Sequence, residues 1–177
     1  TRNYDEAFSL YGLLADSADM DPERKSIEFH LNPNAKWSDG EPVTPEDVLF
    51  TYDVFTDKGR PPYRDRMSLI AKLEKTGDHS VRFTFNDKAN RETPLIIALT
   101  PIIPKHAFNK DTFDKTTLKP VIGSGPYIVD KVQPGQRIVF KRNPNYWGKD
   151  LPSKRGFDNY DQITIEYFLN ANAKTEA

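Results

Sequence analysis

The chain of 177 residues contains no cysteine. Disulfide bonds, thiolate metal sites and a cysteine nucleophile are therefore excluded, while the compartment stays open because proteins inside and outside the cytoplasm can both lack cysteine. An excess of charge of either sign is also missing, since 25 Lys and Arg face 26 Asp and Glu for a net charge of −1. No large field attracts nucleic acid or an anionic membrane, so we expect no nucleic-acid partner.

Long apolar runs are missing as well. The longest begins at Leu95 and is broken by Pro101 and Pro104, well short of the roughly 20 residues that a membrane helix needs. The N-terminal residues show neither the basic region nor the apolar region of a signal peptide. Proline, in contrast, is abundant at 14 residues, and aromatic residues make up 12% of the chain. This composition predicts many turns around a well-filled core and not disorder.

The usual motifs of catalysis and metal binding are absent. The three histidines, His30, His79 and His106, are scattered and show no metal-ligand spacing. The Gly-Ser-Gly loop at residues 123–125 lacks the Gly-x-Ser-x-Gly pattern of a nucleophile elbow and the Lys-Ser/Thr ending of a phosphate loop. These patterns therefore give no candidate catalytic residue, no metal site and no cofactor.

The most informative part of the chain is a strand, a turn and a helix start in close succession. Residues 26–31 alternate apolar and polar side chains, which predicts a half-buried strand. Asp39 and Gly40 then favour a tight turn, because glycine accepts positive φ and aspartate bonds nearby backbone groups. Thr44 is a suitable N-cap and Asp47 completes a capping box, so a helix is predicted over residues 45–55.

The remaining elements follow from the same kind of pattern. Residues 59–63 are expected to form a loop and residues 104–108 a single helical turn. Further strands are predicted at residues 68–75, 81–85, 127–132, 137–142 and 162–168, with a short helix at residues 93–99. Antiparallel hairpins with a few short helices between them indicate an α+β fold.

Two motifs carry a resemblance to a known family. Residues 37–48 read Trp-Ser-Asp-Gly-Glu-Pro-Val-Thr-Pro-Glu-Asp-Val, and residues 123–127 and 141–148 read Gly-Ser-Gly-Pro-Tyr and Lys-Arg-Asn-Pro-Asn-Tyr-Trp-Gly. These are similar to the landmarks of the family 5 extracytoplasmic solute-binding proteins, the peptide- and nickel-binding receptors of ABC importers. A narrower resemblance is to the branch that includes the microcin C and oligopeptide receptor, and it rests on residues 149–152, 155–156, 159–163 and 167–168.

The resemblance implies a fold and an architecture. It implies a type II-like (class C) periplasmic binding protein, with an antiparallel or mixed sheet and a few short helices, of which this chain is a fragment of the first lobe. Residues 1–120 would be the small sub-lobe, and residues 121–177 would return to the main part of the lobe and be incomplete. Strand edges left exposed by the missing parts predict self-association of the fragment.

It also implies a function. The protein would capture oligopeptides, or peptide-nucleotide antibiotics, in the periplasm and pass them to an ABC importer without catalysis. Its partners would be the peptide ligand, the membrane subunits of the importer and the second lobe of the same protein.

Candidate ligand-binding residues are few. Tyr63 on a proline-stiffened loop offers a ring and a hydroxyl to a ligand, and the resemblance places a similar Pro-Tyr near the cleft. Backbone amides of Gly123, Ser124 and Gly125 could meet a peptide backbone, although these glycines also suit a tight path into the next strand. Three other aromatic residues are expected to close the edges of the core: Trp37, Tyr146 and Trp147.

The alternative is a carbohydrate-active enzyme or a sugar-binding accessory domain, suggested by the aromatic residues and acidic turns. It requires two carboxylates facing one cleft about 5–10 Å apart. The candidate pairs are Glu46 with Asp47 and Asp158 with Asp161, for which helix-dipole and solvated-turn roles are the simpler interpretation.

Overall fold

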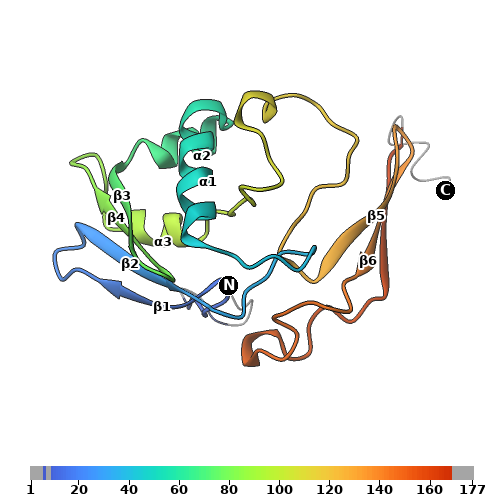
Figure 1. The fold of residues 1–177 in the computed structure, drawn as a ribbon, viewed down its shortest axis with the longest axis horizontal. Coiled ribbons are helices and arrows are strands. Elements are labelled where there is room, and N and C mark those ends of the chain that lie inside the picture. The colour runs from blue at the N-terminus through green and yellow to red at the C-terminus, as the bar shows by residue number, and fades with distance from the viewer. Residues whose placement is uncertain (1–5, 7–8, 169–177) are drawn as a thin grey trace.

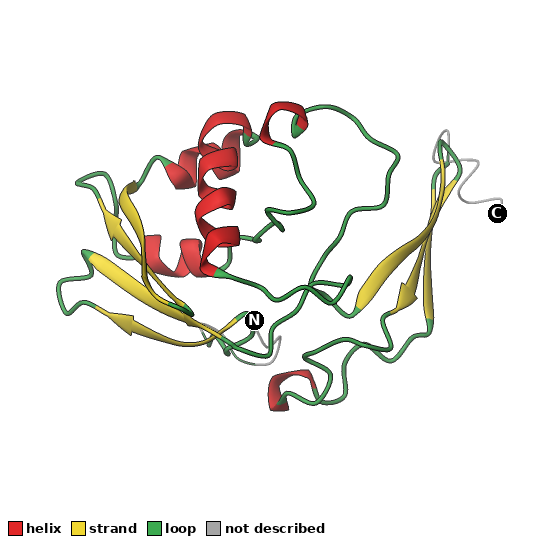
Figure 2. Cartoon of the chain, viewed as in Figure 1, coloured by secondary structure: helices red, strands yellow, loops and turns green. Residues whose placement is uncertain are grey.

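The computed structural model describes residue 6 and residues 9–168. It contains two antiparallel sheets, one of four strands and one of three. Helices pack beside the first sheet, and a long segment with little regular structure leads to the second (Figures 1 and 2). The expected α+β class is confirmed.

The first sheet has the strand order β1-β2-β4-β3. Its strands are β1 (Ala15–Met20), β2 (Ser26–Leu31), β3 (Ile70–Gly77) and β4 (Ser80–Phe85). The β3–β4 hairpin and strand β2 lie where the alternation predicts them. Strand β1 has no counterpart in the sequence prediction, because its residues are mostly exposed and do not alternate. It is held by antiparallel pairing with β2 from Ala15 opposite Leu31 to Met20 opposite Ile27.

Three helices accompany this sheet: α1 (Pro45–Lys58), α2 (Pro61–Met67) and α3 (Thr93–Ala98). The α1 start is as expected, but the helix continues beyond the predicted end at Phe55. The prediction of a loop at residues 59–63 is wrong in its second half. Pro61 begins α2, since the fixed φ of proline suits the first helical position. Among the described residues, no helix combines the length and apolar character needed to cross a membrane.

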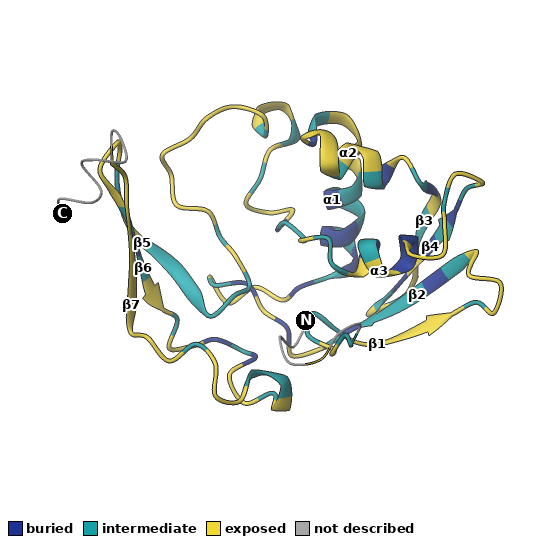
Figure 3. Ribbon diagram, turned by 180° about the vertical axis from the view of Figure 1, so that it is seen from behind, coloured by how far each residue is buried: buried dark blue, intermediate teal, exposed yellow. Residues whose placement is uncertain are grey.

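The main core lies between the helices and the inner face of the first sheet. Figure 3 shows buried segments on β2, β4 and α1 facing one another. The alternation of β4 puts Val81, Phe83 and Phe85 inside, as the sequence predicts. The buried residues of this core are Ile27, Leu31, Val48, Val54, Phe55, Met67, Ile70, Val81, Phe83, Phe85 and Ile97.

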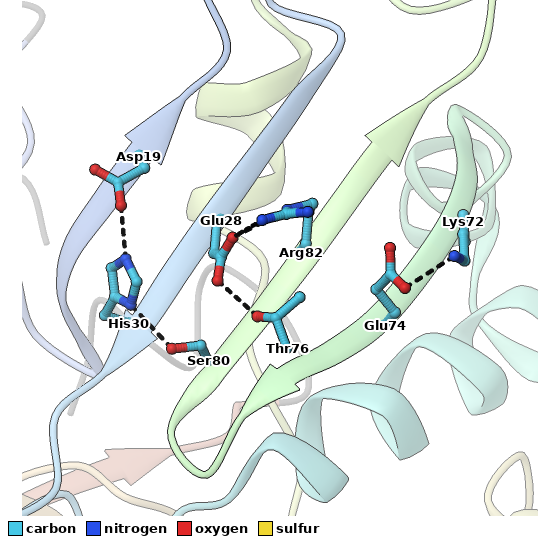
Figure 4. Close-up of polar contacts among 8 residues, drawn as sticks. All are labelled: Asp19, Glu28, His30, Lys72, Glu74, Thr76, Ser80 and Arg82. Atoms are coloured by element: carbon cyan, nitrogen blue, oxygen red, sulfur yellow. Dashed lines mark hydrogen bonds and ion pairs between the residues drawn. The ribbon is translucent and has the colours of Figure 1, made fainter.

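The outer face of the same sheet is polar (Figure 4). Glu28 on β2 accepts hydrogen bonds from Thr76 Oγ1 at 2.6 Å and from Arg82 Nε at 2.9 Å. His30 contacts Ser80 Oγ through Nδ1 at 2.9 Å and Asp19 Oδ2 through Nε2 at 2.8 Å. These side chains cross-link the strands and leave this face to solvent.

The second sheet has the order β5-β6-β7, with β5 (Tyr127–Gln133), β6 (Arg137–Arg142) and β7 (Gln162–Glu166). The predicted hairpin is confirmed, and Gly135 in its turn has φ +72. All five residues of β7 are exposed. Residues 104–108 form a turn with a hydrogen bond from Ala107 N to Pro104 O at 3.2 Å, and not the predicted helical turn.

Candidate functional site

The corner before α1 is organised around the carboxylate of Asp47. This side chain is only 3% exposed. Its Oδ2 accepts hydrogen bonds from Trp37 Nε1 at 3.2 Å, from Thr44 N at 2.9 Å and from Thr44 Oγ1 at 3.1 Å. Its Oδ1 accepts one from Lys105 N at 2.8 Å. Trp37 is equally buried, so both residues build the corner and offer little surface to a ligand.

The turn at this corner is as predicted. Gly40 has φ +96, a conformation that glycine adopts without steric cost. Asp39 Oδ1 accepts from Glu41 N at 3.2 Å, and His106 Nε2 lies 2.7 Å from Asp39 Oδ2. Burial alone would raise the pKa of the Asp39 carboxyl, but the hydrogen bonds from His106 and Glu41 outweigh it and lower the pKa below its ordinary value.

The loop of Gly123, Ser124 and Gly125 is anchored through its carbonyl groups. Gly123 O accepts from Ser38 N at 2.8 Å, and Ser124 O accepts from Trp147 Nε1 at 3.1 Å. The backbone N–H groups of the three residues have no hydrogen-bond partner among the residues that the structure describes. A Cβ added at Gly123 or Gly125 would meet no atom within 4 Å. The loop therefore presents free donors beside open space.

Tyr63 lies on α2 and not on the expected loop. Its ring is half-buried against the main core, with its centroid 4.9 Å from that of Phe55. The guanidinium carbon of Arg66 lies 5.5 Å from the ring centroid. The structure does not bring Tyr63 together with residues 123–125. Gly123 is bonded to Ser38, which precedes the N-terminal end of α1, whereas α2 follows the C-terminal end of α1 (Figure 1).

Two of the three remaining aromatic candidates, Trp37 and Trp147, belong to a second small core. Trp37 is buried there with Ala35 and Val43, and Trp147 packs against them. Tyr146 is buried beside Trp147, with ring centroids 5.8 Å apart and an interplanar angle of 63°. The interpretation of these three aromatics as closing core edges is confirmed.

The four carboxylates that the carbohydrate-active alternative would use already have ion-pair or hydrogen-bond partners within the chain. Three of them form ion pairs: Glu46 with Lys75, Asp158 with Lys154, and Asp161 with Arg142. The hydrogen bond from Lys75 lowers the pKa of Glu46, whereas a general acid needs a raised pKa. The fourth, Asp47, is buried under its four donors. In the described part of the chain, no group of three histidine or carboxylate side chains could hold a metal ion.

Comparison with known proteins agrees with the motifs. Residues 9–177 match the profile of the bacterial extracellular solute-binding proteins, family 5 Middle. The chain is 64% identical over 177 residues to a binding protein of Brucella melitensis and 58% identical to the peptidoglycan-binding protein YepA of Agrobacterium fabrum. It covers 29% of the length of each.

The fold is shared with solved structures. The oligopeptide-binding protein AppA of Bacillus subtilis, solved in complex with a nonapeptide, superimposes with a TM-score of 0.75 at 27% identity. The superposition covers 93% of this chain and 32% of AppA. The expected binding-protein fold is thus confirmed over the share of AppA that the chain spans. This chain belongs to family 5 of the bacterial extracellular solute-binding proteins.

Proposed function

We propose that this chain is part of the first lobe of a periplasmic receptor that captures oligopeptides for an ABC importer and catalyses no reaction. The observation that carries the proposal is the loop of Gly123, Ser124 and Gly125. Its N–H groups are free among the described residues, and open space lies beside it. Backbone donors of this kind bind a peptide main chain whatever its side chains, which suits a receptor for many peptides.

The relatives support a peptide as the ligand. AppA holds a nonapeptide in its solved structure. YepA, at 58% identity, is named a peptidoglycan-binding protein, which favours peptides derived from the cell wall. Peptide-nucleotide antibiotics are the second ligand class. Tyr63 stays a proposed contact, and it would act from α2 through its hydroxyl because its ring already packs on Phe55.

Binding would need parts of the protein beyond these residues. The chain covers 29% of the length of its relatives, so it would provide one wall of a site that closes when two lobes rotate about a hinge. The membrane subunits of the importer and the second lobe are the proposed partners. The division at residue 120 and self-association through the exposed strand edges also stay predictions.

Isothermal titration calorimetry of the full-length protein tests the function, with a peptidoglycan-derived tripeptide and an unrelated tripeptide as ligands. We expect micromolar or tighter binding of at least one by the full-length protein and none detectable by the isolated chain. The Ser124→Pro variant removes one N–H of the loop and should weaken binding about tenfold, the effect of one hydrogen bond of about 1.4 kcal/mol.

Val121→Pro is the matched control, because it stiffens the same segment outside the loop and should leave the affinity unchanged. A full-length protein that binds neither tripeptide would contradict the peptide function. Micromolar binding by the isolated chain would contradict the proposal that this chain provides only one wall of the site, but it would leave the peptide function standing.

A further inference from the structure

A hollow of about 370 Å³ lies between the end of β6 and the turn before β7. Its charged walls are three cations and one carboxylate: Arg142, Lys149, Lys154 and Asp158. Two aromatic residues, Tyr146 and Phe157, also line the hollow. Gly123, Ser124 and Gly125 do not line the hollow, although Pro126, the residue that follows them, does.

Tyr146 gives the hollow an available donor. Its side chain is only 5% exposed, yet its hydroxyl has no hydrogen-bond partner among the residues that the structure describes. In the described part of the chain, every side-chain oxygen or nitrogen atom that is fully buried has a hydrogen-bond partner. Because the Tyr146 hydroxyl has none there, its oxygen atom is not fully buried. Tyr146 is one of the residues that line the hollow.

The surrounding residues keep the hydroxyl in place and protonated. A Cβ at Gly148 would lie 2.6 Å from Tyr146 Oη, so glycine leaves the room that the end of the phenol occupies. Burial, with a smaller effect of the Asp158 charge, raises the pKa of Tyr146 to about 12. The phenol is therefore a hydrogen-bond donor at any pH near neutrality.

The charges around the hollow leave one cation without a partner. Lys154 Nζ lies 2.8 Å from Asp158 Oδ2, which neutralises the carboxylate that would otherwise repel an anion. Arg142 pairs with Asp161, which does not line the hollow. Lys149 forms no ion pair with any described residue. A positive charge and a buried phenol donor together favour an acceptor-only, negatively charged group.

We propose that this hollow binds an oxyanion group, the carboxylate or phosphate of a small molecule, which accepts a hydrogen bond from the Tyr146 hydroxyl and pairs with the Lys149 ammonium. The Phe157 ring, 5.6 Å from Lys154 Nζ at its centroid, offers an apolar wall to the rest of such a molecule. The site needs neither the glycine loop nor a bound peptide.

Isothermal titration calorimetry of the full-length protein tests the site, with inorganic phosphate and acetate as separate probes and sodium chloride keeping the ionic strength constant. We expect saturable binding of at least one probe. Binding of phosphate alone identifies a phosphoryl group, and binding of acetate alone identifies a carboxylate. Tyr146→Phe and Lys149→Gln should each weaken binding at least fivefold.

The control is Lys131→Gln, an exposed lysine of β5 that does not line the hollow, which should bind as the wild type does. Tyr146→Phe keeps the buried ring and removes a hydroxyl that bonds to no described residue, so the fold is preserved; far-ultraviolet circular dichroism checks this. The proposal is overturned if neither probe binds saturably, or if the two variants bind as tightly as the control.

Discussion

The indole N–H of Trp37 donates to the carboxylate of Asp47 at 3.2 Å, and both side chains are buried. The same carboxylate accepts from the backbone N–H of Lys105, 58 residues further along the chain. One side chain thus joins the turn after β2, the first turn of α1 and the segment that leads toward the second sheet. A buried acceptor with several donors is costly to remove, because each donor is left unpaired away from water.

Replacing Asp47 with alanine should lower the free energy of unfolding by about 3 kcal/mol or more, since Trp37, Thr44 and Lys105 all lose their acceptor. Asp47→Asn keeps one carbonyl oxygen and should cost about half as much. Urea denaturation followed by tryptophan fluorescence measures both. Asp87→Ala, at an exposed carboxylate, is the control and should change the free energy by less than about 0.5 kcal/mol. If Asp47→Ala and the control were equally stable, the Asp47 carboxylate would not stabilise the fold as the shared acceptor of these donors.

Gly148→Ala should destabilise the packing around Tyr146. The new methyl group would lie 2.6 Å from Oη and 2.7 Å from Cζ of Tyr146, and overpacking of this kind costs about 1–3 kcal/mol. Gly123→Ala is the matched variant, because a Cβ there meets no atom within 4 Å. Thermal unfolding of the two variants should show a lower midpoint for Gly148→Ala alone. Similar midpoints would mean that the phenol moves aside freely.

Gly40→Ala should lower the free energy of unfolding by about 1 kcal/mol through the backbone alone. Its φ of +96 is one that residues with a Cβ rarely adopt, although the methyl group would meet no atom within 4 Å. Gly125→Ala has the same open surroundings without the positive φ and serves as the comparison. Chemical denaturation should separate the two variants, and a Gly40→Ala protein as stable as Gly125→Ala would contradict a strained turn.

Glu28 should make the fold sensitive to acid. Hydrogen bonds from Thr76 and then Arg82 lower the pKa of Glu28 below its ordinary value of 4.5. Because the folded-state pKa is the lower one, the stabilisation is complete above that ordinary value and is lost as the pH falls through the folded-state pKa.

Denaturation of the wild type and Glu28→Gln between pH 7 and pH 3 measures this contribution. The difference in their free energies of unfolding should be constant near neutrality and shrink below pH 4.5, the ordinary pKa. Glu166→Gln, at an exposed position on β7, should show no such convergence. A difference that stays constant down to pH 3 would exclude Glu28 as the source of acid sensitivity.

The candidate site could be located from the sequence only in part. The loop of Gly123, Ser124 and Gly125 is visible as a motif, but the partners of its carbonyl groups, Ser38 and Trp147, come from distant segments. The two prolines before Tyr63 predict a loop, but in the structure they begin α2. The hollow beside Tyr146 had no sequence signal, since it depends on which groups remain unpaired after folding.

Sequence patterns within a few residues determined those helices, strands and turns that are stabilised by contacts between near neighbours in the chain. The alternation of β2 and β4, the capping box of α1 and the glycine in the β5–β6 turn each follow from neighbours a few residues apart. Tertiary structure alone decided strand β1, whose exposed residues are held by pairing with β2. It also decided the bond from Lys105 to Asp47. Such long-range pairings depend on the packing of the whole chain, and no short stretch of sequence encodes them.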